Sequence, residues 1–223
     1  MKTMHRFYLG ALLSFVASAT LAAPVYWTDW TSQTAATSSV QGTLTTPTST
    51  INVGFSGAYS FAQTSGGTNY WNPSAPYTSA TVDNAPPAAD IIALNTGGTA
   101  TVTFSQAVTD PFIALVSWNG NTANFGVPIN ILSFGAGFWG NGTPILNPQG
   151  DGFLGSGEVH GVIRLPGTYT SISFTHTSEN WHGFTVGVAG LADNGGTVPE
   201  PGTLTLLAFG LLGLVMRQLR KSV

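Results

Sequence analysis

The chain has 223 residues with 28 glycines and 13 prolines, and only 7% of its residues are charged, compared with about 25% in an average soluble domain. Between Ala23 and Thr197 it carries eight acids and a single base, Arg164, so this part has a formal charge of −7, which argues against nucleic acid as a partner because phosphate binding needs clustered Lys and Arg. The chain has no cysteine, which excludes disulfides, thiolate metal sites and thiol nucleophiles.

The first residues have the organisation of a secretory signal peptide. Lys2 and Arg6 precede an apolar stretch at 7–17, and a run of small residues follows at 17–23. These are the basic region, the hydrophobic region and the cleavage segment of a signal peptide. We expect residues 1–22 to be removed on export, leaving a body that begins at Ala23.

Residues 23–191 show the pattern of an all-β domain. Short runs rich in β-branched and aromatic residues alternate with Gly, Pro and Asn, and no apolar pattern at helical spacing is long enough to sustain a helix. About ten strands in such a length predict a jelly-roll-like two-sheet β-sandwich. The expected strands are 40–46, 51–55, 58–63, 99–105, 112–118, 125–134, 159–165, 170–177 and 182–189.

Two of these strands have informative side-chain patterns. In 99–105, Ala100, Val102 and Phe104 share one face while Thr and Ser take the other, as in a strand with one buried face. The run 112–118 is almost wholly apolar, which is typical of a central strand covered on both faces.

Two stretches fit the strand pattern less well. Residues 28–50 contain 13 Ser or Thr among 23, so they form either a ragged edge strand or a solvated segment. Residues 66–87 are rich in Gly, Asn, Pro, Tyr and Trp and predict a long ordered loop, and such loops are often functional.

Aromatic side chains in expected loops are candidates for carbohydrate binding, because flat rings stack on the C–H surfaces of sugars. The candidates are Tyr70, Trp71, Tyr77 and Trp139. The alternative is that these large rings are buried in a core short of Leu and Ile, and that is what we expect for Trp118 and Trp181.

His176, Glu179 and His182 form a candidate metal site. If 177–181 is a symmetric hairpin loop, Phe174 pairs with Phe184 and the two histidines face each other with Cβ atoms about 5 Å apart. Two imidazoles and the loop glutamate could then share a metal ion. The alternative is that both histidines end the core face and bind backbone or water.

The remaining acids give no complete catalytic or calcium motif. The glycine-rich run 150–158 contains Asp151 and Glu158 but lacks the Asp series of an EF-hand loop, so a plain hairpin is expected there. Glu158 and Glu179 are the only glutamates in the body, and a glycosidase would need them at a defined separation. We expect no enzymatic activity and no cofactor, with structural calcium as the alternative.

The C-terminal region has three parts after a polar linker at 192–197. A Pro199-Glu200-Pro201 triplet precedes an uncharged run at 203–216, and a basic tail with Arg217, Arg220 and Lys221 follows. Fourteen helical residues span about 21 Å, short of a hydrocarbon core roughly 30 Å thick. The basic tail favours a cytoplasmic C-terminus, which leaves the body outside the inner membrane.

In this order, residues 198–223 resemble the PEP-CTERM sorting signal of Gram-negative bacteria that produce exopolysaccharide. The resemblance implies that an exosortase-type membrane protease recognises the triplet, cuts near it and passes the body outward. Segments of the body, namely 70–71, 80–92, 137–140 and 179–187, look like those of uncharacterised secreted proteins that carry this tail. No activity comes with that second resemblance.

These patterns lead to one functional hypothesis with two alternatives. We expect a secreted, surface-sorted, non-enzymatic component of an extracellular polysaccharide matrix, anchored in the inner membrane only until it is processed. The first alternative is a carbohydrate-binding module that uses exposed Trp and Tyr, and the second is a carbohydrate-active enzyme.

Overall fold

The computed structural model describes residues 24–192 of the chain. The expected signal peptide, the linker residues 193–197 and the sorting signal lie outside the described residues. In the described range no helix has the length and apolar character needed to cross a membrane.

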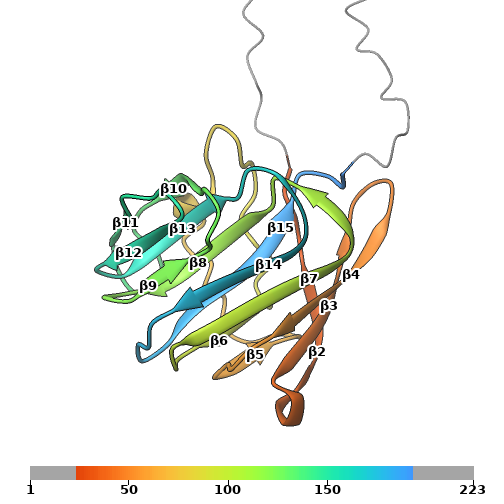
Figure 1. Ribbon diagram of the computed structural model, residues 1–223, viewed down its shortest axis with the longest axis horizontal. Helices are drawn as coiled ribbons and strands as arrows, with labels where there is room; N and C mark the ends of the chain where they lie inside the picture. The colour runs from red at the N-terminus through yellow and green to blue at the C-terminus, as the bar shows by residue number, and fades with distance from the viewer. Residues whose placement is uncertain (1–23, 193–223) are drawn as a thin grey trace, which may run out of the picture. The chain divides into compact units, whose positions relative to one another are not determined.

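The described residues form two antiparallel sheets (Figure 1). The seven-stranded sheet has the order β10-β13-β8-β15-β6-β5, with β1 added on β15, and the eight-stranded sheet has the order β11-β12-β9-β14-β7-β4-β3-β2. The strands of the first sheet are β1 (Tyr26–Trp27), β5 (Phe61–Gln63), β6 (Ile91–Leu94), β8 (Phe112–Trp118), β10 (Asn130–Phe134), β13 (Val159–Arg164) and β15 (His182–Val188). Those of the second are β2 (Asp29–Thr34), β3 (Ser39–Thr45), β4 (Thr50–Ser56), β7 (Gly98–Thr109), β9 (Thr122–Asn124), β11 (Thr143–Leu146), β12 (Gly152–Ser156) and β14 (Thr168–His176). Two short 3-10 turns, η1 (Ala35–Thr37) and η2 (Ala75–Tyr77), complete the fold.

The main core lies between the two sheets. On β7, alternate residues Ala100, Val102 and Phe104 are buried, and β14 opposes them in register, with Val102 beside Ile172 and Ala100 beside Phe174. These side chains meet inward-facing residues of β8 and β15. Burial of one face of each sheet stabilises the pair by about 25 cal/mol per Å² of apolar surface, so the alternation of the sequence determines which face becomes the core.

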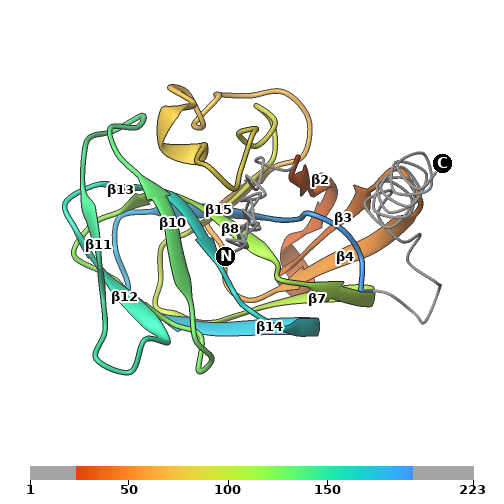
Figure 2. The same ribbon diagram turned by 90° about the horizontal axis from the view of Figure 1, so that it is seen from above.

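A second layer of core covers the outer face of the seven-stranded sheet. Residues 64–90, which we call the covering loop, fold back over that face, as the yellow segment of Figure 2 shows. Trp71, Tyr77 and Val82 of this loop pack on outward-facing apolar residues of β6, β8 and β13. All seven residues of β8 are therefore buried, which confirms the double-sided burial expected for 112–118.

The covering loop is tied down by polar contacts at two points. The Asn84 side chain accepts from the Val25 amide at 2.7 Å and donates to the Val25 carbonyl at 2.9 Å, which fixes the loop to the residue just before β1. At the other side, the Ser133 hydroxyl donates to the Pro76 carbonyl at 2.7 Å. The long ordered loop expected from the sequence is thus confirmed, and its order has a physical basis.

The all-β class with two antiparallel sheets is confirmed, and the sandwich-like packing follows from the shared core. The finer jelly-roll assignment stays a prediction. The Ser- and Thr-rich region 28–50 begins with β2, which is the edge strand of the eight-stranded sheet. This agrees with the edge-strand alternative for that region. The expected strand 125–134 is shorter in the structure, where β10 begins only at Asn130, after Gly126 and Pro128.

The expected hairpin between residues 170–177 and 182–189 is wrong. β14 belongs to the eight-stranded sheet and pairs with β7 and β9, whereas β15 belongs to the seven-stranded sheet and pairs with β8, β6 and β1. The connection crosses from one sheet to the other, because Thr177 bonds to Thr122 of β9 instead of to β15. Phe174 and Phe184 still meet, with ring centroids 5.4 Å apart, but across the core.

Candidate functional site

Aromatic side chains from four separate segments meet at the edge of the covering loop. Their ring centroids form a continuous series, with separations of 4.9 Å from Trp139 to Phe138, 5.1 Å from Phe138 to Tyr70, 5.0 Å from Tyr70 to Trp181 and 5.6 Å from Trp181 to Phe61. We call these five residues the aromatic patch. Trp139 is 55% exposed and Phe138 37% exposed, and the other three rings are half-buried.

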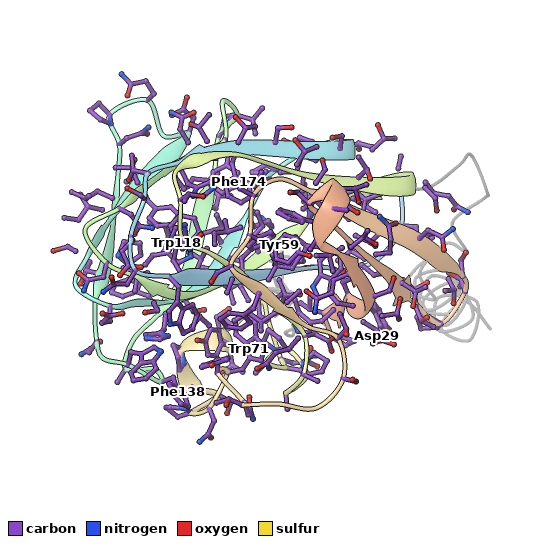
Figure 3. The ribbon with its side chains drawn as sticks, turned by 90° about the horizontal axis from the view of Figure 1, so that it is seen from below. Asp29, Tyr59, Trp71, Trp118, Phe138 and Phe174 are labelled. Carbon is purple, nitrogen blue, oxygen red and sulfur yellow. The ribbon has the colours of Figure 1, made fainter. Side chains whose placement is uncertain are left out.

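The aromatic patch rests on buried residues of the covering loop. Trp71 and Tyr77 are almost completely buried and stack edge to face at 5.2 Å. Figure 3 shows Trp71 and Phe138 on the same side of the molecule, away from Phe174 of the main core. This corrects the expectation of exposed rings at Trp71 and Tyr77, because the loop that carries them folds back on the sheet and uses them as its core.

A buried histidine holds the exposed end of the aromatic patch in place. His160 of β13 is completely buried, and its Nδ1 lies 3.1 Å from the Tyr77 hydroxyl. Its Nε2 accepts the backbone N–H of Trp139 at 3.4 Å, and its ring fills the space above Gly137. Burial lowers the pKa of His160 to about 4, so the ring is neutral near pH 7 and can accept this hydrogen bond.

Glu158 lies beside Gly140, the residue that follows Trp139. Its Cβ and Cγ lie against Gly140, where a side chain would approach within about 3 Å of them. The Glu158 carboxylate accepts hydrogen bonds from the Ser117 hydroxyl and, at 2.8 Å, from the Asn119 side chain. Both donors are neutral, so the charge of Glu158 is hydrogen-bonded but not paired with a base.

Glu179 lies at the same end of the sandwich, in the connection between β14 and β15. Burial raises the pKa of Glu179, and repulsion by the Glu158 carboxylate raises it further. The two side chains are therefore within electrostatic range of each other, and we call them the carboxylate pair. Glu158 borders the aromatic patch through Gly140, and Glu179 precedes Trp181 of the patch by two residues in the sequence.

The two histidines of the candidate metal site bond to each other. His182 Nε2 lies 3.0 Å from His176 Nδ1, and both side chains are buried. His182 Nδ1 lies 3.8 Å from Glu179 Oε2, and neither of these two atoms has a hydrogen-bond partner. Burial lowers the pKa of both histidines, and the neighbouring imidazole lowers that of His182 further.

The three candidate ligands therefore come together, but as a linear chain of contacts. A shared metal needs lone pairs that converge on one point, whereas the facing nitrogens of His176 and His182 occupy each other. Within residues 24–192 no group of three or more His, Asp or Glu side chains has a metal-binding arrangement. The arrangement matches the alternative in which both histidines end the core face.

The glycine-rich run 150–158 forms a turn and a strand. Asp151 Oδ1 accepts from the side-chain amides of Asn147 at 2.6 Å and Asn124 at 3.2 Å, and Asn147 Oδ1 accepts the Asp151 amide N–H at 3.0 Å. β11 and β12 pair on either side of this turn. The hairpin expected in this run is confirmed in part, because the run supplies the end of the turn and the second strand, while β11 before it supplies the first.

The sequence patterns did not predict three residues of the aromatic patch. They did not indicate Phe61 and Phe138 as binding residues, and they predicted Trp181 in the core, whereas it is half-buried in the patch. One available signal was the position of Phe138 and Trp181 in glycine- and asparagine-rich connections, which tend to lie on the surface. Of the predicted carbohydrate-binding residues, the patch contains Tyr70 and Trp139.

The sorting residues Pro199, Glu200, Pro201, Arg217, Arg220 and Lys221 lie outside the described residues, but a comparison with known families covers them. Residues 197–221 match the PEP-CTERM protein-sorting motif. The chain carries a PEP-CTERM sorting motif. This motif implies export, processing by an exosortase, which is a membrane protease, and membrane-associated sorting before surface or extracellular release. No curated protein and no solved structure matches the chain.

Proposed function

We propose that this PEP-CTERM protein is a non-enzymatic component of the extracellular polysaccharide matrix and that it holds glycan through the aromatic patch. The observation that carries the proposal is the patch itself, a continuous series of five rings with Phe138 and Trp139 open to solvent. Large exposed apolar patches on soluble domains usually mark a binding surface. Export and surface sorting bring such a patch into contact with polysaccharide.

The composition of the patch supports glycan over protein or nucleic acid as the ligand. Its rings can stack on sugar C–H faces, while Asn119 and the carboxylate pair beside it can bind hydroxyls. The body has a single base, so it has little means to hold an acidic polysaccharide by charge. We expect neutral glycans to bind with weak affinity per site and with little dependence on salt.

The ends of the chain fit this role. In the proposed route, residues 1–22 direct export, and the short apolar run 203–216 holds the chain in the inner membrane with its body in the periplasm. Exosortase then cuts near the Pro-Glu-Pro triplet and releases the body to the cell surface or matrix. The aromatic patch would retain it there after the anchor is lost.

Affinity electrophoresis in gels that contain the host polysaccharide or neutral glycans tests the proposal. Trp139→Ala and Phe138→Ala should each reduce retardation of the protein by the glycan. Leu146→Ala is the matched control, because Leu146 is a similarly exposed apolar residue (45%) on β11, outside the patch. Equal retardation of all three variants and the wild type would rule out binding through the patch.

A second candidate, a carbohydrate-active enzyme, is favoured by one observation. The carboxylate pair consists of a glutamate with a raised pKa and a second, hydrogen-bonded glutamate within electrostatic range, next to rings that could hold a sugar. An acid with a raised pKa beside an ionised carboxylate is the pattern of glycosidases. Release of reducing ends from oligosaccharides, lost in Glu179→Gln, would identify this activity in place of simple binding.

A further inference from the structure

The carboxylate pair gives the border of the aromatic patch a negative charge that no base neutralises. Glu158 receives hydrogen bonds only from Ser117 and Asn119, which are neutral. Arg164, the one base among residues 24–192, ends β13, whereas Glu158 immediately precedes the start of that strand. Within the described part of the chain, the border of the patch therefore attracts cations and offers them no competing partner.

Glu179 lies between the buried His182 and solvent. Glu179 Oε2 and His182 Nδ1 are 3.8 Å apart, and neither has a partner. His182 is completely buried and directed toward the glutamate, while Glu179 keeps 15% of its side-chain surface exposed. Both atoms are closed to solvent, so a ligand can reach Glu179 only from its exposed side.

We infer that the aromatic patch and the carboxylate pair together recognise a polysaccharide that carries free amino groups. A protonated amino sugar is complementary to both parts of the site. Its ammonium group carries a positive charge and three donors for the carboxylates, and aromatic faces attract cations, while its ring still offers C–H surfaces for stacking. The inference rests on the proposed glycan binding and specifies the class of sugar.

A divalent cation fits these residues less well than an ammonium group. Calcium takes six to eight oxygen ligands, whereas the Glu158 oxygens already accept from Ser117 and Asn119. Rings such as Trp139 and Trp181 offer no oxygen ligands at all. An organic cation, by contrast, can contact a ring face and a carboxylate at the same time.

Three oligosaccharides of equal length and linkage, which differ only at C2 of each sugar, test the inference on the purified full chain in detergent. They are the β-1,4-linked oligomers of glucose, N-acetylglucosamine and glucosamine, which carry a hydroxyl, an acetamide or an amine. At a pH at which the amine is protonated and carboxylates are ionised, calorimetry should give about fivefold to tenfold tighter binding for the glucosamine oligomer. That preference should shrink in high salt and when the amine is deprotonated.

Charge-removing variants show which residues cause the preference for the glucosamine oligomer. Glu158→Gln and Glu179→Gln should each reduce the ratio of glucosamine-oligomer affinity to glucose-oligomer affinity, and a circular-dichroism spectrum like that of the wild type shows that each variant is folded. Asp29→Asn is the matched control, because Asp29 is exposed on β2 and lies on the other side of the molecule from Phe138 in Figure 3. It removes the same net charge and should keep the preference.

The two proposals fail in different ways. Equal binding of the glucose and glucosamine oligomers would overturn amine recognition and leave glycan binding intact. An amine preference that falls as much in Asp29→Asn as in the glutamate variants would also overturn it, because the net charge would then be the cause. If none of the three oligomers binds, amine recognition is overturned, and the electrophoresis experiment decides the proposed function separately.

Discussion

His160 joins the buried core of the covering loop to the exposed part of the aromatic patch. It touches the Tyr77 hydroxyl on one side and the Trp139 amide on the other. The second contact depends on a neutral ring, because protonated His160 could no longer accept the Trp139 N–H. The position of Trp139 is therefore linked to the protonation state of a completely buried residue.

Acid should destabilise the domain partly through His160. Its pKa is about 4 in the folded protein and about 6.5 when unfolded. As the pH falls through this window, the unfolded chain takes up a proton that the folded chain does not, so the free energy of unfolding decreases, by roughly 3 kcal/mol in total, and levels off below pH 4. Urea unfolding between pH 4 and 8 should show that the free energy of unfolding decreases less toward acid pH in His160→Gln than in the wild type.

Asp90 provides the control for this titration, because it acts in the opposite direction. Burial raises the pKa of Asp90 to about 6, so its folded form takes up a proton first and gains stability as the pH falls. Asp90→Asn should therefore steepen the loss of stability in acid. If His160→Gln and the wild type lose stability in parallel, His160 does not contribute to the pH dependence.

The burial of single aromatic residues is one feature that the local sequence does not predict. Trp71 and Trp139 both lie in loops rich in Gly and Asn, yet one is 2% and the other 55% exposed. The difference arises because the covering loop folds back on the seven-stranded sheet, whose outer face is apolar, while the segment with Trp139 borders that layer. Both loops are rich in Gly and Asn, so this local signal does not separate them and the tertiary contacts do.

At the scale of elements, β10 depends on an unusually close approach to β13. A Cβ added at Gly161 would overlap the Ser133 carbonyl oxygen and the Phe134 backbone across this pair. β10 also carries the Ser133 hydroxyl that holds Pro76 of the covering loop. A glycine in β13 is thus required for the loop beneath the aromatic patch to stay in place.

Gly161→Ala should displace β10 and destabilise the protein by about 1–3 kcal/mol, because the added methyl overpacks a backbone contact. Hydrogen exchange of the amides in β10 should accelerate more than in β14. Gly98→Ala in β7 is the matched control, since a Cβ there meets no atom within 4 Å. Unfolding midpoints that are equal for the two variants would contradict the role of this close approach.

The connection between β14 and β15 explains which features of the fold the sequence could specify. Alternation correctly places Phe174 and His176 on one face, and Phe184 and His182 on one face of the next strand. The same side chains can be buried in a hairpin, where the two strands pair within one sheet, or in an arch, where each strand belongs to a different sheet. The choice depends on the partners that β7, β8 and β9 supply from far along the chain, which local patterning does not encode.

At the scale of the whole molecule, acidic and basic residues lie in different parts of the chain. The body carries eight acids and one base, while the basic residues gather at the ends of the chain. Such a body is repelled by anionic lipid surfaces. Attraction to such surfaces through basic residues is therefore confined to the ends of the chain.

Glu200→Ala should leave an unprocessed form in the inner membrane. Glu200 is the single charge of the Pro-Glu-Pro triplet, and its loss removes the only ionic contact that the triplet offers to the exosortase. Mass spectrometry of wild-type surface material should find no peptides from 217–221, and the variant should retain them. Asp193→Asn, an acid removed just before the motif, should be processed normally. Intact 217–221 peptides in wild-type surface material would refute processing.

The first and last strands of the described body are neighbours. β1 pairs with Val188 and Gly187 of β15, and the Thr28 amide donates to the Val186 carbonyl at 2.9 Å. A polypeptide delivered from its N-terminus therefore holds its first strand without a partner until nearly all of the body has followed. Pairings over such a sequence separation close late in folding. In a chain delivered in that order, β1 can therefore complete its pairing with β15 only when Val188 has followed, shortly before residues 197–221.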